Sequence, residues 1–332
     1  MIIYQKIVDA ILHSNNIVIT AHKSPDGDSI GSSIGLYRFI KKLGKQVTIC
    51  HPDRCPSYLS WLEDVQDIQV FEESPETVTN VIFNADLLIC LDYNNYSRVG
   101  EQMQQVLEQF DKKIILIDHH LSPAPITDLI LSNTEVCSTC QLIYEVIINS
   151  NQAHLIDSSI ATPLYLGIVT DTGSFRFPSV EARTHEIVAQ MLALGVVHYK
   201  VHQNTFDNNT IDRLKLRGYA TSEKLELVFN NKIAIISLSQ EELNKFNYQK
   251  GDTEGLVNVA LSIDGVKAAV MLTEQDNLIR MSFRGKDEYE VNIIANQEFG
   301  GGGHKYAAGG SSTSSLEETI VKLKSKIPVY FS

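Results

Sequence analysis

The amino-acid sequence predicts an α/β protein with two domains: an N-terminal, mainly parallel sheet covered by helices, and a smaller C-terminal α/β domain, with a cleft between them. Near-continuous apolar runs at 87–91 and 113–117 alternate with segments of helical periodicity, a pattern typical of parallel strands that are buried on both faces. After residue 225, short strand-like runs are joined by short polar turns, which indicates β-hairpins.

The first domain is expected to cover 1–196 and to begin with an amphipathic helix at 1–12. Its strands are expected at 17–20, 45–50, 87–91 and 113–117, and its further helices around 34–40, 59–62, 101–110, 138–148 and 163–169. Because strands and helices alternate, we expect the strands to lie parallel in one sheet.

The segment 197–224 is polar and helix-like, and we expect it to connect the first domain to a second one at 225–332. The expected elements of the second domain are hairpins at 225–238 and 266–284 and helices at 254–262, 291–297 and 316–326. A glycine-rich stretch at 299–310 precedes the last helix.

The composition is that of a globular, acidic protein. Of 332 residues, 43% are hydrophobic and 20% are charged, and the formal net charge of -12 argues against binding of duplex nucleic acid. No apolar run is long enough to cross a bilayer, and 1–12 lacks the features of a signal peptide, so we expect a cytoplasmic protein without a membrane partner. The five cysteines do not indicate a disulfide framework, and Cys137 and Cys140 are expected to be reduced, structural thiols.

Most of the chemically active side chains follow apolar elements. The polar turn at 21–32 connects the first strand to its helix and carries His22, Asp26 and Asp28. Acids or histidines reappear where three later apolar elements end, at Asp92, Asp118, His119, His120 and Asp171. Because ligands bind beyond the carboxyl ends of strands in open α/β sheets, we expect these side chains to share one site.

Six of these residues form a set suited to divalent cations, with four carboxylates and two imidazoles: His22, Asp26, Asp28, Asp92, His119 and Asp171. This set fits two ions of intermediate hardness, such as Mn²⁺, with Mg²⁺ or Co²⁺ as alternatives. Taken singly, each acid is more simply explained as a turn residue or a helix cap. Their joint occurrence favours the metal site.

The two neighbouring histidines have different expected roles. Adjacent side chains of an extended segment point to opposite sides, so only one of His119 and His120 is expected to be a direct ligand. The other is available to contact a phosphoryl oxygen or to protonate a leaving group, and Asp118 is placed to orient an imidazole. A buried, hydrogen-bonded histidine is the simpler alternative.

A second set of candidate residues belongs to the C-terminal domain. The glycines at 300–303 before His304 allow close approach of a ligand and offer N–H groups to an anion, but they lack the spacing of a Walker loop. Arg284 is suited to pair with a phosphate or to stack on a base. Arg284, like Arg98 and Arg176, is explained equally well as a surface arginine.

Together these motifs resemble the DHH phosphoesterase superfamily, which includes the RecJ exonucleases. The resemblance rests on the segments 22–28, 118–120 and 171–173 with Asp92, and, for a DHH-associated substrate-binding domain, on 282–284, 291–292 and 299–310. The compact two-domain length resembles the bifunctional oligoribonuclease/pAp phosphatase subgroup, often called nanoRNases.

The resemblance implies a role for each residue. One metal ion would be held by His22 and Asp26, and the other by Asp28, His119 and Asp171. Asp92 would bridge both ions, and His120, oriented by Asp118, would contact the scissile phosphate. The implied substrate-binding residues are Arg284, Gly301, Gly302, Gly303, His304 and Arg98. Tyr93 and Asn94 stand where smaller residues are commoner in the family.

The resulting hypothesis is hydrolysis of short oligoribonucleotides, of 3′–5′ exonuclease type, and of nucleoside 3′,5′-bisphosphates such as pAp, by a hydroxide that two metal ions activate. The expected partners are short single-stranded RNA or small nucleotides and, from the resemblance, a second copy of the chain in a homodimer. Two alternatives stay open. A phosphodiesterase for cyclic or linear di-AMP would use the same residues, whereas a non-catalytic nucleotide sensor would be expected to have lost metal ligands.

Overall fold

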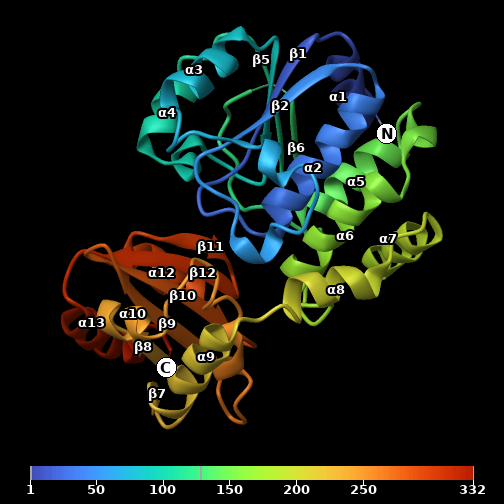
Figure 1. The fold of residues 1–332 in the computed structure, drawn as a ribbon. Helices are drawn as coiled ribbons and strands as arrows, with labels where there is room; N and C mark the ends of the chain where they lie inside the picture. The colour runs from blue at the N-terminus through green and yellow to red at the C-terminus, as the bar shows by residue number, and fades with distance from the viewer. Residues whose placement is uncertain (1, 128, 332) are drawn as a thin grey trace. The chain divides into compact units, whose positions relative to one another are not determined.

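The structure is a computed structural model that describes residues 2–127 and 129–331 (Figure 1). The chain divides into two compact units, Met1–Asn208 and Asn209–Ser332. The first unit contains a parallel sheet with helices on both faces, and the second contains a mixed sheet with helices, so the α/β class predicted for each domain is confirmed.

The sheet of the first unit has six strands, and all neighbouring strands are parallel. Their spatial order is β3 (Gln69–Val70), β2 (Gln46–His51), β1 (Asn16–Thr20), β4 (Leu87–Leu91), β5 (Lys113–Asp118) and β6 (Ile130–Ser132). The chain order reverses between β1 and β4, where Thr20 lies opposite Cys90. Ligands of open α/β sheets bind beyond the carboxyl ends of the strands at such a reversal.

Helices cover both faces of this sheet (Figure 1). On one face, α1 (Ile2–Leu12), α2 (Gly27–Lys42), α5 (Thr139–Ile148) and α6 (Ser158–Asp171) share a core with Ile17 and Ile19. On the other face, α3 (Pro75–Asn84) and α4 (Glu101–Leu107) pack with Val18. Successive side chains of β1 point to opposite faces of the sheet, because side-chain direction alternates along a strand.

The remaining helical elements of the first unit are α7 (Ala182–Ala193), α8 (His198–Phe206) and the 3₁₀ turns η1 (Ser57–Leu59), η2 (Val65–Asp67), η3 (Tyr96–Val99) and η4 (Ala153–Leu155). The helix expected at 59–62 is therefore only the turn η1. The sequence pattern also did not reveal β3, β6, α3 or α7. Strands of two or three residues, such as β3 and β6, are too short to show a period.

α6 begins earlier than the predicted helix at 163–169. Asp157 caps it by accepting a hydrogen bond from the backbone N–H of Ser159. Pro163 lies inside the helix and offers no N–H to the carbonyl oxygen of Ser159. Arg38 donates to that oxygen from Nη1 at 2.7 Å, so an interior proline is accommodated without leaving the carbonyl unpaired.

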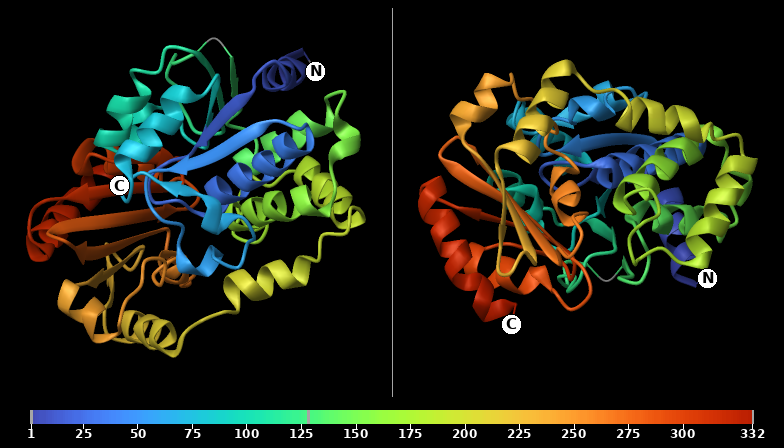
Figure 2. Two further views of the ribbon diagram at one scale, coloured as in Figure 1. Left: turned by 45° about the horizontal axis from the view of Figure 1, so that its top comes forward. Right: turned by 90° about the horizontal axis from the view of Figure 1, so that it is seen from below.

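α2 and α6 lie unusually close together along one row of residues. A Cβ atom at Gly27, Gly31 or Gly35 would overlap atoms of α6. Figure 2 shows α2, in blue, beside the green helices α5 and α6 in two further views. Since α2 begins and α6 ends at the same edge of the sheet, this contact determines how far Asp28 lies from Asp171.

The second unit has a six-stranded mixed sheet. Its order is β11 (Gly302–His304), β12 (Ala307–Ser312), β10 (Leu278–Gly285), β9 (Ala268–Gln275), β8 (Ile233–Leu238) and β7 (Leu225–Val228). β8 and β9 pair in parallel, and the other neighbours pair antiparallel. Both predicted hairpins, β7–β8 and β9–β10, are present.

Two hydrophobic cores flank this second sheet. α12 (Val291–Phe299) and α13 (Leu316–Tyr330) contribute to one core. α9 (Ile211–Ser222), α10 (Gln240–Lys245) and α11 (Leu256–Leu261) contribute to the other. The segment 197–224 contains α8 and α9, and the division between the units falls inside it, with α8 in the first unit and α9 in the second.

The glycine-rich stretch is part of the sheet. Gly300, with φ at +56°, ends α12, and the next residues form β11, which pairs with β12. A Cβ atom at Gly301 would overlap the carbonyl oxygen of Gly309, so the packing of the chain itself requires glycine there. At Gly302, a Cβ atom would have no neighbour within 4 Å among the described residues.

Across the described ranges, no helix combines the length and the apolar character that crossing a membrane requires.

Candidate metal centre

The turn between β1 and α2 places two acids and one histidine at the edge of the first sheet. Asp26 is the N-cap of α2, and its Oδ1 accepts hydrogen bonds from the backbone N–H of Asp28 and Ser29, both at 3.0 Å. Its Oδ2 faces His22 Nε2 at 3.7 Å. Asp26 is therefore both a helix cap and a member of the acidic cluster. The two explanations considered for this residue, a cap and a metal ligand, are compatible.

The imidazole of His22 is oriented by the backbone. Its Nδ1 lies 2.9 Å from the carbonyl oxygen of Lys23, which can only accept, so Nδ1 carries the proton of this bond. The lone pair of the neutral ring is then on Nε2, which lies 3.3 Å from Asp92 Oδ2. His22, Asp26 and Asp92 thus bring three ligand atoms within 4.8 Å of one another.

Asp92 directly follows β4 and lies in the middle of the cluster. While Oδ2 faces His22, Oδ1 lies 3.7 Å from His119 Nε2. Its backbone is left-handed, with φ at +61°, a conformation that costs free energy in a non-glycine residue but that aspartate tolerates better than most. The next residue, Tyr93, is fully buried and shares a hydrogen bond of 2.7 Å with Thr20 Oγ1, so it anchors this turn in the core.

A second group of three ligand atoms within 4.8 Å is formed by Asp28, His119 and Asp171. His119 Nε2 lies 3.8 Å from Asp28 Oδ2 and 3.4 Å from Asp171 Oδ2. Asp28 is 1% exposed, and both of its oxygens accept backbone N–H groups from the first turn of α5. Asp171 is the last residue of α6, and about a third of its side chain is exposed.

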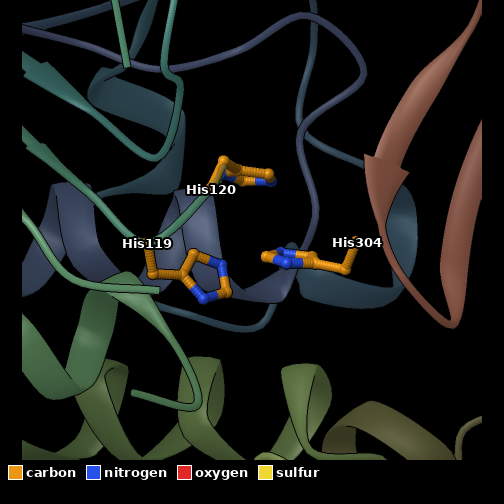
Figure 3. Close-up of side chains that lie close together, drawn as sticks. All are labelled: His119, His120 and His304. Atoms are coloured by element: carbon orange, nitrogen blue, oxygen red, sulfur yellow. The ribbon is translucent and has the colours of Figure 1, made fainter. Parts of the chain in front are cut away.

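His120 has a different partner from that of His119. Its Nδ1 lies 2.7 Å from Asp118 Oδ1, and its backbone N–H donates to Asp118 Oδ2 at 3.0 Å. Asp118 is fully buried at the end of β5. The rings of His119 and His120 lie edge to face with centroids 4.8 Å apart (Figure 3). Both face Asp92 Oδ1, at 3.7 and 3.8 Å, but only His120 is bonded to Asp118.

The electrostatics reflect four acids gathered in little space. Burial, followed by the charge of Asp171, raises the pKa of Asp28 to about 6. Burial and the charge of Asp28 raise the pKa of Asp92 well above its usual range. Burial acts to lower the pKa of His22, but the interactions with Asp26 and Asp92 outweigh it and raise that pKa. The cluster thus carries more negative charge than the protein itself compensates.

Arg98 adds a positive charge near His120. Burial is the largest influence on the pKa of His120 and lowers it, and the charge of Arg98 lowers it further, against the opposing effect of Asp118. Arg98 lies in η3. Arg176 is exposed and donates from Nε to the carbonyl oxygen of Gly173, so its guanidinium is used in the turn that follows α6.

The candidate residues of the second unit lie on β10 and β11. Arg284, in β10, donates from Nη1 to the carbonyl oxygen of Phe283 at 2.9 Å. Arg284 Nε and Asn292 Oδ1 are buried and have no hydrogen-bond partner within the described part of the chain. Gly302, Gly303 and His304 make up β11, and Gly301 directly precedes it.

The donor set of the cluster fits divalent cations. Carboxylate oxygens and neutral imidazole nitrogens suit ions of hard to intermediate character. The two groups meet at Asp92, whose two oxygens face different histidines. A bound cation favours the ionised forms of Asp28 and Asp92, against the burial and mutual repulsion that raise their pKa values. The residues present therefore fit two adjacent ions.

One residue of the site escaped prediction from the sequence. Thr139 begins α5, donates from Oγ1 to Asp92 Oδ1 at 2.9 Å, and donates from its backbone N–H to Asp28 Oδ2 at 2.7 Å. In the sequence, Thr139 stands between Cys137 and Cys140, the two cysteines of the CxxC spacing. The signal available was Ser138, a residue type that begins helices.

Known proteins share both parts of this chain. The DHH family, N-terminal domain, matches residues 16–168, and the DHHA1 domain matches residues 230–327. A relative from Streptococcus mutans, named probable bifunctional oligoribonuclease and PAP phosphatase NrnA, is 30% identical over 318 residues, which are 96% of this chain and 96% of that protein.

Two further relatives extend the comparison. The cyclic-di-AMP phosphodiesterase GdpP of Bacillus subtilis is 28% identical over 99% of this chain, and this match covers 50% of that protein. The crystal structure of an exopolyphosphatase-related protein from Bacteroides fragilis superimposes with a TM-score of 0.93 at 32% identity, covering 99% of this chain and 96% of that one.

Proposed function

The chain belongs to the DHH family, and from this premise we propose that it is a metal-dependent phosphoesterase that hydrolyses short oligoribonucleotides, with 3′–5′ exonuclease polarity, and nucleoside 3′,5′-bisphosphates such as pAp. The observation that carries the proposal is the position of Asp92, whose two carboxylate oxygens face two separate groups of ligand atoms. This is the arrangement that a bridging carboxylate between two ions needs.

In this proposal each ion has its own residues. His22 and Asp26 would hold one ion, Asp28, His119 and Asp171 would hold the other, and Asp92 would belong to both. The pair, which we propose to be Mn²⁺ with Mg²⁺ or Co²⁺ as substitutes, would supply charge stabilisation for a phosphoryl group and activation of water. We assign proton transfer and substrate binding to residues of the protein.

We assign His120 to the substrate. Since Nδ1 donates its N–H proton in a hydrogen bond to Asp118, Nε2 is the nitrogen that faces the substrate, and it donates to a phosphoryl or leaving-group oxygen when the ring is protonated. The carboxylate of Asp118 holds the ring in this tautomer and stabilises its charged form, because a buried anion next to an imidazolium lowers its energy. Arg98 adds a positive charge close to His120, where substrate phosphate would lie.

We assign recognition of a terminal nucleotide phosphate to the second unit, with Arg284, Gly301, Gly302, Gly303 and His304. A buried guanidinium nitrogen without a partner is costly unless a ligand pairs with it, and Arg284 Nε is such an atom among the described residues. The relative from Streptococcus mutans, by its name, acts on oligoribonucleotides and on PAP, which supports small, phosphate-ended substrates for this chain also.

The second candidate is a di-AMP phosphodiesterase. The Bacillus subtilis relative that is named for cyclic di-AMP matches nearly the whole of this chain but is about twice as long. The cluster of metal-ligand types would serve either substrate. The presence of all six residues disfavours a sensor without catalysis.

A substrate panel tests the proposal. The purified chain is incubated with Mn²⁺ and, in separate reactions, a dinucleotide, pAp, cyclic di-AMP and inorganic polyphosphate, and product release is followed by chromatography. We expect release of mononucleotide from the dinucleotide and of phosphate from pAp, and loss of both with EDTA. Preferred cleavage of cyclic di-AMP would select the second candidate.

Variants connect the activity to the site. Asp28→Ala and His119→Ala are expected to abolish turnover while leaving the fold intact by circular dichroism. Asp86→Asn is the matched control, because this exposed acid caps β1 by accepting the backbone N–H groups of Asn15 and Asn16, away from the cluster. Full activity of Asp28→Ala or His119→Ala would refute the assignment.

A further inference from the structure

The first turn of α5 provides three hydrogen bonds to Asp28 and Asp92, the two most buried carboxylates among the six candidate metal ligands. The backbone N–H groups of Thr139 and Cys140 donate to Asp28 at 2.7 and 2.9 Å, one to each oxygen. The side chain of Thr139 donates from Oγ1 to Asp92 Oδ1 at 2.9 Å. One turn of helix thus binds both Asp28, which belongs to the second ligand group, and Asp92, which is common to both groups.

These donors are not required by the helix itself. The first N–H groups of any helix have no partner within it. In α5, Ser138 caps the helix by accepting the backbone N–H of Gln141 on its Oγ at 3.1 Å. The N–H groups of Thr139 and Cys140 are therefore available, and the structure directs them at a carboxylate that is 1% exposed.

The hydroxyl of Thr139 is the one side-chain donor among the three. A carboxylate can rotate about its Cβ–Cγ bond, and the direction of its two oxygens decides which neighbours they face. The bond to Thr139 fixes Oδ1 of Asp92, so that Oδ1 remains on the side of His119 and Oδ2 on the side of His22. Partners of this kind orient metal ligands and are expensive to remove.

We propose that Thr139 is a positioning residue that holds Asp92 in the orientation that two adjacent divalent cations need. The inference rests on the proposed function, because it concerns the same ions. It assigns to the hydroxyl a task that the backbone of α5 cannot perform, since the N–H groups of this turn already serve Asp28.

The test is a calorimetric titration of the metal-free full chain with Mn²⁺, without substrate. Thr139→Val keeps the shape of the side chain and removes the donor, and we expect Mn²⁺ affinity to fall roughly 10–100-fold. Thr139→Ser keeps the donor and is expected to retain the affinity. Thr139→Ala is a second variant without the donor, which decides the question if valine at this position prevents folding.

Thr205→Val is the matched control. Thr205 is also buried in the first unit, at 2% exposure, but its hydroxyl accepts the indole N–H of Trp61 at 3.2 Å. We expect this variant to unfold at a lower temperature and to bind Mn²⁺ with unchanged affinity, whereas Thr139→Val loses affinity. Comparing the two separates a general loss of stability from loss of orientation at the site.

The outcomes are distinguishable. Unchanged Mn²⁺ affinity in folded Thr139→Val or Thr139→Ala overturns the role of Thr139, while the proposed function stands. A loss in Thr139→Ser as large as that in Thr139→Val also overturns it, because the hydroxyl would not be the cause. If the unchanged chain binds no Mn²⁺ at all, the proposed function itself fails.

Discussion

The two units place their candidate residues in different kinds of position. In the first unit, Asp92 directly follows β4 and His119 directly follows β5, and the backbone N–H of Asp92 makes one last bond to the carbonyl oxygen of Ile117 in β5 at 3.1 Å. In the second unit, Arg284 lies within β10 and Gly302 within β11. A residue at the end of a strand has few pairing bonds to keep, whereas a residue inside a strand is part of the sheet on both sides along the chain. Function and packing are therefore separable by position in the first unit and only by experiment in the second.

Asp92→Asn tests the first half of this comparison and has the largest expected effect. The substitution removes one anionic ligand and leaves the shape, and loss of several kcal/mol of charge stabilisation corresponds to a fall in turnover of roughly 10³-fold. The metal-free protein is expected to become more stable, because an amide in place of Asp92 ends the repulsion with Asp28. Turnover and thermal unfolding with EDTA are the measurements.

A fall in both turnover and metal-free stability would contradict this expectation, since it would show that Asp92 is needed for packing. Candidate residues of the first unit would then also serve packing, as those of the second unit do, and the two units would no longer differ in this respect.

Two neighbouring glycines test the second half. In Gly301→Ala, the new methyl group would overlap the carbonyl oxygen of Gly309, and such overpacking costs about 1–3 kcal/mol of the free energy of unfolding. Gly302→Ala meets no described atom within 4 Å, and is expected to unfold at an equal or higher temperature because alanine restricts the unfolded chain. Differential scanning calorimetry compares the two.

The same pair separates packing from binding. If β11 receives a substrate phosphate, Gly302→Ala should raise KM for pAp although the protein is stable, and Mn²⁺ affinity should stay unchanged in both variants. Unchanged kinetics in Gly302→Ala would leave these glycines with a structural role alone.

The smallest expected effect concerns Asp157, the cap of α6, which ends at the metal centre. Burial acts to raise the pKa of Asp157, but the ion pair with Lys42 and the bonds from Ser159 outweigh it and lower this pKa to about 2. The pKa is depressed in the folded state, so the stabilisation is present above the unfolded pKa of about 3.9 and is lost as pH falls toward 2.

Asp157→Ala is expected to lower the free energy of unfolding by about 1 kcal/mol at pH 7. The difference from the unchanged protein should shrink below pH 4 in urea titrations. Asp157→Asn keeps a capping oxygen, so its loss should be smaller. An effect that grows on acidification would show that the charge of Asp157 does not act as described.

The site residues that the sequence predicts are those that follow a strand or precede a helix, because the order of strands and helices alone places them at one edge of the sheet. The apolar run that became β4 predicted where Asp92 would stand, and the turn before α2 predicted Asp26 and Asp28. Thr139 has no local signature, because its partner Asp92 is 47 residues away. The requirement for Gly301 depends likewise on the opposite strand, since only the pairing of β12 brings Gly309 against it. Contacts that the three-dimensional fold creates are invisible to a local pattern.

The row of glycines on α2 has a consequence for the rigidity of the metal centre. At Gly31 the main chain of α2 lies directly against the main chain of α6, at the carbonyl oxygen of Pro163. No side chain separates the two backbones at Gly31. Rotamer changes of side chains between the helices therefore cannot alter the distance between Asp28 and Asp171 at this point. The separation of these two acids is therefore set by direct contact between the backbones of two helices.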